Sequence, residues 1–220
     1  SFFIIFLLSC MDADETETSV SDSSAGKSVT LPGSDGILKS VSSAATQEYS
    51  YTYRECVYIQ SPGATEPVTI AANILVPNPL TKGQRFPAII FANSWALEEH
   101  EYIAQAIHFA KKGYIVLSFS SRGWGLSGGK VALGSPEDWA DFSAVVDWLI
   151  ANSPVDESNI GVCGISLGGG TALNAAAHES RIKTAVGISA WTDLETHMWS
   201  QETPKLVWGS LLVITGTILA

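Results

Sequence analysis

The apolar positions from residue 49 onward follow two periodicities, one typical of strands and one typical of helices. Alternating β-rich segments cover residues 51–59 and 68–76, and a Ser-Pro-Gly turn at Ser61 separates them, which predicts an antiparallel pair. Continuous apolar runs, typical of strands buried on both faces, cover residues 87–92, 114–119, 160–165 and 184–189. Apolar residues recur at helical spacing within residues 102–110 and 139–149, and a run of small residues predicts a third helix over residues 167 to about 178. This alternation predicts an α/β fold with a mostly parallel sheet covered by helices on both faces.

Two of the predicted helices carry signals at their ends. The acidic pair Glu98-Glu99 predicts the start of the first helix, and Lys111-Lys112-Gly113 predicts its end. The second helix is predicted to begin at Ser135, a good N-cap, with Pro136 in the first helical position.

The first 48 residues differ in character from the rest. Residues 1–10 are an apolar run that is too short to span a bilayer but has the size of a signal-peptide core, and residues 11–48 are an acidic, Ser/Thr-rich tether. Leu7-Leu8-Ser9-Cys10 resembles the end of a bacterial lipoprotein signal, which implies lipidation of Cys10. The resemblance implies an exported protein anchored in a membrane, periplasmic or at the cell surface. An ordinary cleaved secretory signal or a chance apolar start is the alternative.

Composition narrows the function classes. The chain has 220 residues and 46% hydrophobic content, enough for one sizeable core, and a net charge of −10. Nucleic acid is excluded as a partner, because phosphate binding needs a basic face and the longest basic run is Lys111-Lys112. The three cysteines show no metal-ligand spacing. We expect no metal and no organic cofactor.

The strongest chemical motif is Gly164-Ile165-Ser166-Leu167-Gly168, which matches G-x-S-x-G. It stands between a predicted strand and a predicted helix, where this motif holds a nucleophilic serine on a sharp turn. Small residues are needed on both sides because the turn leaves no room for side chains. We therefore predict Ser166 as the catalytic nucleophile, with Gly164 and Gly168 making the turn possible.

An oxyanion hole needs two hydrogen-bond donors beside the nucleophile. One is the backbone N–H of the residue that follows the serine, here Leu167. The other comes from the loop after the third strand, Asn93-Ser94-Trp95, where the N–H of Trp95 is favoured over that of Ser94.

A second glycine-rich stretch, Arg122-Gly-Trp-Gly-Leu-Ser-Gly128, contains a literal G-x-G-x-x-G after a strand. In a dinucleotide site the glycines open directly into a helix that holds the pyrophosphate. Here five residues, 130–134, separate the glycines from the predicted helix, so a nucleotide site is disfavoured.

In order along the chain, these motifs resemble a known family. Asn93-Ser-Trp95, Arg122 to Gly128, Gly164 to Gly169 and Ser189-Ala-Trp-Thr-Asp193 look like the Xaa-Pro dipeptidyl-peptidases and their cocaine-esterase-like relatives within the α/β-hydrolase superfamily. The resemblance covers residues 49 to the end. It implies that Ser166 is the nucleophile, that Leu167 supplies an oxyanion N–H, and that Arg122 supports the loop after the fourth strand. A tyrosine often joins the oxyanion hole in this family, whereas this loop offers Trp95.

The function expected from these residues is hydrolysis of a peptide or ester bond through an acyl-enzyme on Ser166. Carboxylesterase rather than peptidase activity is one alternative. A non-catalytic, surface-tethered binding protein on the same scaffold is another, because a fold alone does not establish a function.

The stretch after Ser166 is short for this fold, whose acid and histidine follow the serine along the chain. We expect an α/β-hydrolase core over residues 49–205, truncated after about the sixth strand, and the start of a helical cap over residues 206–220. Asp193 is a weak candidate for the acid, and the four histidines are expected to be surface or packing residues. The chain by itself is therefore expected to be inactive.

Overall fold

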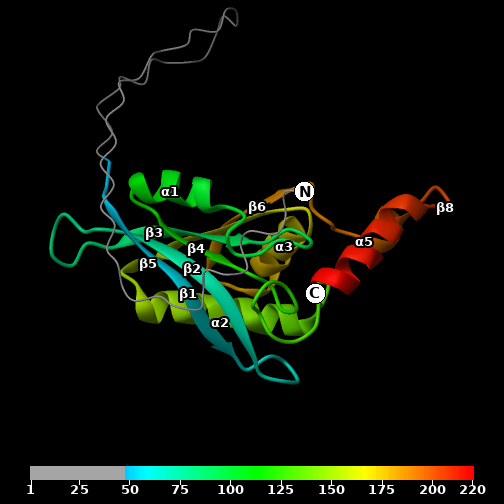
Figure 1. Ribbon diagram of the computed structural model, residues 1–220. Helices are drawn as coiled ribbons and strands as arrows, with labels where there is room; N and C mark the ends of the chain where they lie inside the picture. The colour runs from blue at the N-terminus through cyan, green and yellow to red at the C-terminus, as the bar shows by residue number, and fades with distance from the viewer. Residues whose placement is uncertain (1–47) are drawn as a thin grey trace, which may run out of the picture. The chain divides into compact units, whose positions relative to one another are not determined.

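The predicted strands pair into one six-stranded sheet in the computed structural model, which describes residues 48–220 (Figure 1). Its strands are β1 (Tyr51–Ser61), β2 (Val68–Pro77), β3 (Phe86–Ala92), β4 (Ile115–Phe119), β5 (Val155–Ile165) and β6 (Ile182–Ile188). Their spatial order is β1-β2-β4-β3-β5-β6. β1 and β2 are antiparallel to their neighbours, and β4, β3, β5 and β6 run parallel. The predicted antiparallel pair and the parallel part of the sheet are both present.

Helices cover both faces of this sheet, as Figure 1 shows for α1 and α2. The helices are α1 (Ile103–Lys111), α2 (Pro136–Asn152), α3 (Leu167–His178), α4 (Leu194–Met198) and α5 (Leu206–Leu219). α1 packs on one face through Ala106 and Ala110, with Phe91 and Val116 of the sheet. α2 and α3 share the larger core on the opposite face, where Phe142 and Ala172 are buried. The sheet is therefore covered on both sides, which is why its central strands are continuously apolar.

The parallel strands end together and so define where a site can lie. In the register of the sheet, Ala92 pairs with Gly164, and Ile165 pairs with Ile188. The loops that follow β3, β5 and β6 consequently leave the same edge. In open α/β sheets, ligands bind in the crevice outside these carboxyl ends.

The start of α2 agrees with the start predicted from the sequence, and the start of α1 does not. Ser135 caps α2 as predicted, accepting a hydrogen bond from the backbone of Glu137, and Asp138 completes a capping box. α1 begins at Ile103 instead of at the acidic pair, and its first turn holds no acidic residue. The reason is that Glu99 lies in a turn ahead of the helix, where its side chain is 2% exposed and bonded to Ser120.

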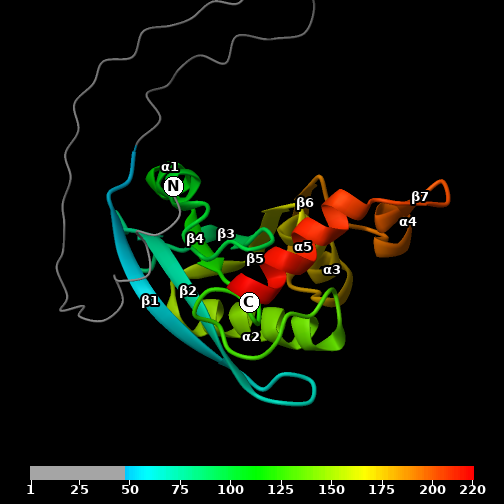
Figure 2. The same cartoon turned by 45° about the vertical axis from the view of Figure 1, so that its right-hand side comes forward.

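The C-terminal region contains elements that the sequence pattern predicted only in part. The apolar run after residue 205 forms α5, which lies beyond the sheet (Figures 1 and 2). The short helix α4 and the hairpin of β7 (Trp199–Ser200) and β8 (Thr203–Pro204) were not predicted. Within residues 48–220, no helix combines the length and apolar character that a membrane crossing requires. The predicted signal segment, Cys10 and the tether up to residue 47 lie outside the described residues.

Candidate active site

The elbow, residues 164–168, carries Ser166 between β5 and α3. Ser166 has φ 55° and ψ −117°, a conformation that non-glycine residues rarely adopt. Its N–H donates to the carbonyl of Ile188 over 2.9 Å, and its own carbonyl accepts from the N–H of Gly170 over 3.1 Å. The turn is therefore anchored on one side to β6 and on the other to α3. This leaves the half-buried Ser166 side chain at the carboxyl edge of the sheet.

The two glycines of the motif are required by close backbone approach. A Cβ on Gly164 would lie 2.2 Å from the carbonyl oxygen of Gly168, and a Cβ on Gly168 would lie 2.2 Å from that of Ala92. Neither obstacle is a flexible side chain. The elbow is thus pressed against the end of β3, which brings the loop after β3 next to Ser166.

The loop after β3 offers one free donor beside the elbow. The Ser94 N–H and hydroxyl donate to Glu101 Oε2 and Oε1, each over 2.6 Å, and Ser94 Oγ lies 3.1 Å from the carbonyl oxygen of Ile165. Within residues 48–220, the backbone N–H groups of Trp95 and Leu167 have no hydrogen-bond acceptor. Of the two candidates in this loop, Trp95 therefore remains available and Ser94 does not.

Three polar residues whose side chains had no role assigned from the sequence hold this loop and the elbow. Glu101 binds both the N–H and the hydroxyl of Ser94. Tyr102 stacks on Phe91 with centroids 4.6 Å apart, and its hydroxyl accepts from the N–H of Ile165 over 3.1 Å. Burial raises the pKa of Tyr102 to about 12, so the phenol stays protonated at neutral pH.

Asn93 is the third of these residues. Its Oδ1 accepts from the N–H of Ser121 over 2.8 Å, and its Nδ2 donates to the carbonyl of Leu97 over 2.7 Å. Its place directly after a buried strand was a signal that could have found it. Glu101 and Tyr102 carried no such signal, because they fell in a stretch that was interpreted as the start of a helix.

Arg122 supports the loop after β4 through a buried ion pair. Its Nε and Nη2 lie 2.7 and 2.9 Å from the two carboxylate oxygens of Asp141, and both side chains are about 3% exposed. Ser61 of β1 donates to the same carboxylate over 2.5 Å. The hydrogen bonds that Arg122 donates to Asp141 are the main reason that the Arg122 pKa is raised. The glycine stretch that follows folds onto β2, where the Gly128 N–H donates to the carbonyl of Thr69 over 2.8 Å.

A cluster of three tryptophans lies beside the elbow. The centroid of Trp95 is 4.9 Å from that of Trp124 and 5.7 Å from that of Trp191. Leu167, the residue after the nucleophile candidate, and Leu212 of α5 pack into the same cluster. The Trp95 indole N–H donates to Thr215 Oγ1 of α5 over 2.9 Å. The elbow and α5 therefore pack into one aromatic cluster.

The structure gives Asp193 a local role. It is exposed and caps α4, accepting from the N–H groups of Glu195 and Thr196 over 3.0 and 3.3 Å. The hydroxyl of Thr196 also donates to this carboxylate, and these bonds lower its pKa.

The histidines are engaged elsewhere. His178 stacks on Trp139 at 3.7 Å between centroids, and His197 stacks on Trp191 at 5.8 Å. Within residues 48–220, no histidine side chain forms a hydrogen bond with Ser166 or Asp193. The structure does not bring a serine, a histidine and an acid together in this part of the chain.

Known proteins share both the sequence pattern and the fold. The family model for X-Pro dipeptidyl-peptidase (S15 family) matches residues 66–216. PA2218, an uncharacterized protein of Pseudomonas aeruginosa, is 36% identical over 122 residues, which are 54% of this chain and 33% of PA2218. YcjY, an uncharacterized protein of Escherichia coli, is 31% identical over 126 residues, 56% of this chain and 41% of YcjY. The matched segments thus span between a third and two fifths of these relatives.

Solved structures identify the fold as that of an α/β-hydrolase. The crystal structure of PA2218 superposes with a TM-score of 0.58 at 24% identity, covering 86% of this chain and 58% of PA2218. An acetyl xylan esterase from Paenibacillus sp. R4 superposes with a TM-score of 0.56 at 18% identity, covering 77% of this chain and 67% of the esterase. At these identities the likeness concerns the fold alone.

Proposed function

Because this chain belongs to the X-Pro dipeptidyl-peptidase (S15) family, we propose that it is part of a serine hydrolase that cleaves acyl bonds through Ser166. The observation that carries the proposal is the strained turn at Ser166, φ 55° and ψ −117°, pressed against the end of β3. Strain of this kind persists where the surrounding structure maintains it, and it is concentrated at functional sites.

The proposed reaction uses the groups around this turn in a defined order. Ser166 Oγ attacks the carbonyl carbon of the substrate and gives its proton to a base. The backbone N–H groups of Leu167 and Trp95 stabilise the oxyanion of the tetrahedral intermediate. Collapse of the intermediate forms the acyl-enzyme and expels the amine or alcohol, which takes the proton from the base. Water then attacks the ester and releases the acid, and the proton returns to Ser166.

The proposal does not assign the base to any histidine described here. Within residues 48–220, none of them forms a hydrogen bond with Ser166, and an alcohol without a base is a weak nucleophile. The expectation that these 220 residues alone lack activity therefore stays a prediction. It would be wrong if this chain hydrolysed p-nitrophenyl acetate and Ser166→Ala abolished that turnover.

Labelling with a fluorophosphonate tests the nucleophile in the whole protein. We expect stoichiometric labelling that Ser166→Ala abolishes, because the probe phosphonylates only an activated serine. Ser210→Ala, an exposed serine on α5, is the matched control and should label like the wild type. Labelling that persists in Ser166→Ala, or no labelling of the wild type, would contradict the proposal and favour a binding protein on this scaffold.

A further part of the proposal is whether the leaving group is an amine, as in a peptidase, or an alcohol, as in an esterase. The family description names a dipeptidyl-peptidase and a structural neighbour is named as an esterase, and both reactions use the same elbow. Comparison of kcat/KM for an Xaa-Pro p-nitroanilide and for p-nitrophenyl acetate on one preparation separates them. We expect peptide cleavage. Ester turnover without any anilide turnover would point to a carboxylesterase.

Location is proposed separately from the chemistry. The apolar start and Cys10, both outside the described residues, support attachment to a membrane through a lipid. Cys10→Ala should move the protein from the membrane to the soluble fraction. A wild type that already fractionates as soluble would contradict this proposal.

A further inference from the structure

The turn ahead of α1 gathers three potential metal ligands outside the catalytic machinery. Glu98, Glu99 and His100 each offer one ligand atom, and these atoms all lie within 4.8 Å of one another. His100 Nδ1 is 3.4 Å from Glu98 Oε1 and 3.8 Å from Glu99 Oε1. Two carboxylates and one imidazole therefore face a common point.

In the described part of the chain, two carboxylates and a single basic side chain meet at this turn. Glu99 is 2% exposed, and a buried carboxylate is costly unless a cation or hydrogen bonds compensate it. The hydroxyl of Ser120 bonds to Oε2 of Glu99. Within residues 48–220, no lysine or arginine forms an ion pair with Glu98 or Glu99, and His100 is their one basic neighbour at this range. A further positive charge would stabilise the cluster.

Buried polar atoms next to the turn also lack partners. Asn73 of β2 is 1% exposed, and its Nδ2 donates to the carbonyl of Glu99 over 2.8 Å, so its amide group lies against the cluster. Within residues 48–220, Asn73 Oδ1 has no hydrogen-bond partner, and neither does His100 Nδ1. Ser118, which pairs with Asn73 in the register of β2 and β4, is 1% exposed and has an unpartnered hydroxyl. Buried polar groups are normally satisfied, so the unpartnered oxygens of Asn73 and Ser118 indicate a missing partner beside this turn.

We infer that Glu98, Glu99 and His100 bind one divalent transition-metal ion, next to the buried amide of Asn73. The mixed set of carboxylate oxygen and imidazole nitrogen suits Mn²⁺ or Zn²⁺. The side chains of Glu98 and His100 are 30% and 23% exposed, which gives the ion a path from solvent to the buried Glu99. All three ligands are supplied by a single turn.

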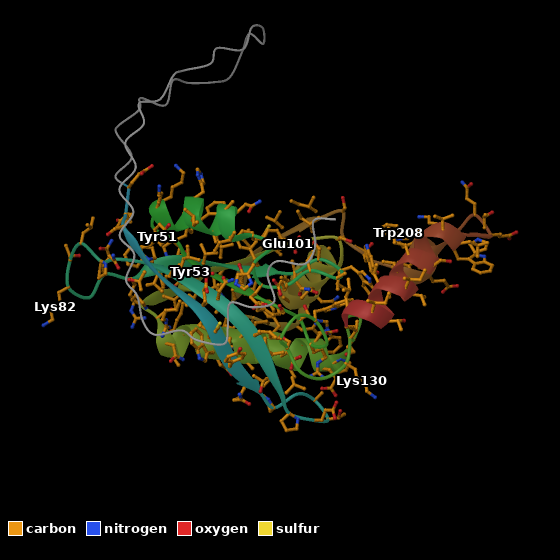
Figure 3. All side chains as sticks on the ribbon, viewed as in Figure 1. Tyr51, Tyr53, Lys82, Glu101, Lys130 and Trp208 are labelled. Atoms are coloured by element: carbon orange, nitrogen blue, oxygen red, sulfur yellow. The ribbon has the colours of Figure 1, made fainter. Side chains whose placement is uncertain are left out.

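The ion would act on the loop that carries the proposed oxyanion donor. Glu101 follows the cluster directly and holds Ser94, the neighbour of Trp95. In Figure 3, Glu101 is labelled on this connection between β3 and α1. Binding at the turn would therefore fix the loop without any contact between metal and substrate. The inference does not depend on the serine chemistry.

Titration of Mn²⁺ into the chelator-treated, untagged protein, followed by the electron paramagnetic resonance signal of free Mn²⁺, tests the site. We expect one saturable site per chain, for which Zn²⁺ competes. Glu98→Gln and His100→Asn should each weaken binding at least tenfold, because each removes a ligand at a partly exposed position. His108→Asn, an exposed histidine on α1, is the matched control and should bind like the wild type.

The outcomes separate the alternatives. No saturable binding would overturn the inference, and so would a site whose affinity is unchanged in both Glu98→Gln and His100→Asn. In either case, ordered water or the contact between His100 and Glu98 satisfies the turn. The readout needs no catalysis. Failure to bind Mn²⁺ therefore leaves the serine-hydrolase proposal intact, and an inactive protein that still binds Mn²⁺ leaves the metal-site proposal intact.

Discussion

The elbow and α5 each contribute a leucine to the same tryptophan cluster, yet they are held in different ways. Gly164 and Gly168 bring the elbow into backbone contact with its own turn and with β3. α5 reaches the cluster through the side chains of Leu212 and Thr215. The elbow is therefore held by close backbone contacts at the carboxyl edge of the sheet, whereas α5 is held by side-chain contacts.

Exposure shows the same contrast. The elbow helix α3 buries the whole glycine run at its start, whereas Leu212 is the one buried residue of α5. On α5, Val207 is 88% exposed and Ile218 is 72% exposed, and Trp208 is seen on this helix in Figure 3. Local opening is easiest where few apolar contacts are buried. We therefore expect α5 to detach without disturbing the elbow.

The largest expected difference between the two regions comes from adding one methyl group to each. Gly168→Ala places a Cβ 2.2 Å from a backbone oxygen that cannot move aside, so we expect a loss of more than about 4 kcal/mol or failure to fold. Gly216→Ala on α5 meets the Trp95 ring at 2.8 Å, a side chain that can shift. The gain in helix propensity of about 1 kcal/mol offsets part of that strain. Urea unfolding of both variants checks this, and equal losses would refute the contrast.

Removing the buried charge of Arg122 should have the next largest effect. Arg122→Met leaves Asp141 buried without its cation, which typically costs about 3–5 kcal/mol. The loss should also disturb the tryptophan cluster, because Trp124 lies on the same loop. Lys183→Met, an exposed lysine, is the control and should change stability by less than about 0.5 kcal/mol. Urea unfolding measures both, and near-wild-type stability of Arg122→Met would show that the pair does not hold this loop.

The sequence predicted the elbow side of this comparison well because its signals are local. The helix over residues 167–178 was predicted with the bounds that α3 has, since a glycine motif marks its start and the end of the small-residue run marks its end. The strands were found for a similar reason, because burial on both faces leaves an uninterrupted apolar run. The sequence also predicted correctly that Ser135 caps α2.

The loop before α1 was predicted less well because tertiary contacts decide its structure. An acidic pair ahead of an apolar repeat is an ordinary signal for a helix start. Here Glu99 bonds to Ser120 and Glu101 bonds to Ser94, residues that lie 21 and 7 positions away along the chain. The local pattern of polar and apolar residues does not indicate such distant partners. The cap at Asp193 was missed for the opposite reason, because a helix of five residues is too short to show a periodicity.

A change in pH should act on the elbow helix and not on α5. Hydrogen bonds from Arg181 lower the pKa of Glu179, which caps the end of α3, to about 2 from its ordinary value of 4.5. Because the folded-state pKa is the lower one, this contribution is fully present above about pH 4.5 and is lost as the pH falls toward 2. Glu179→Gln should cost about 2 kcal/mol at pH 7 and lack this acid-dependent loss.

The pH prediction is measured by urea unfolding at steps from pH 7 to 2.5. Glu157→Gln, an exposed carboxyl, is the control and should follow the wild type. α5 contains no titratable side chain, so hydrogen exchange of its amides should show no transition in this window beyond the intrinsic effect of pH. A wild-type curve parallel to that of Glu179→Gln would contradict the role of the Arg181 pair.

The smallest expected effect isolates the contact that holds α5. Thr215→Val keeps the side-chain shape but removes the oxygen that accepts from the Trp95 indole N–H over 2.9 Å, a net loss of about 1 kcal/mol. Amides of α5 should then exchange faster while those of β5 and α3 keep the wild-type rate, because the elbow does not depend on this bond. Thr217→Val is the matched control, since its hydroxyl bonds only within the helix, to the carbonyl of Val213 over 2.7 Å. If β5 and α3 opened together with α5 in Thr215→Val, the two regions would form one cooperative unit. The proposal that backbone contacts hold the elbow independently of the side-chain contacts of α5 would then be wrong.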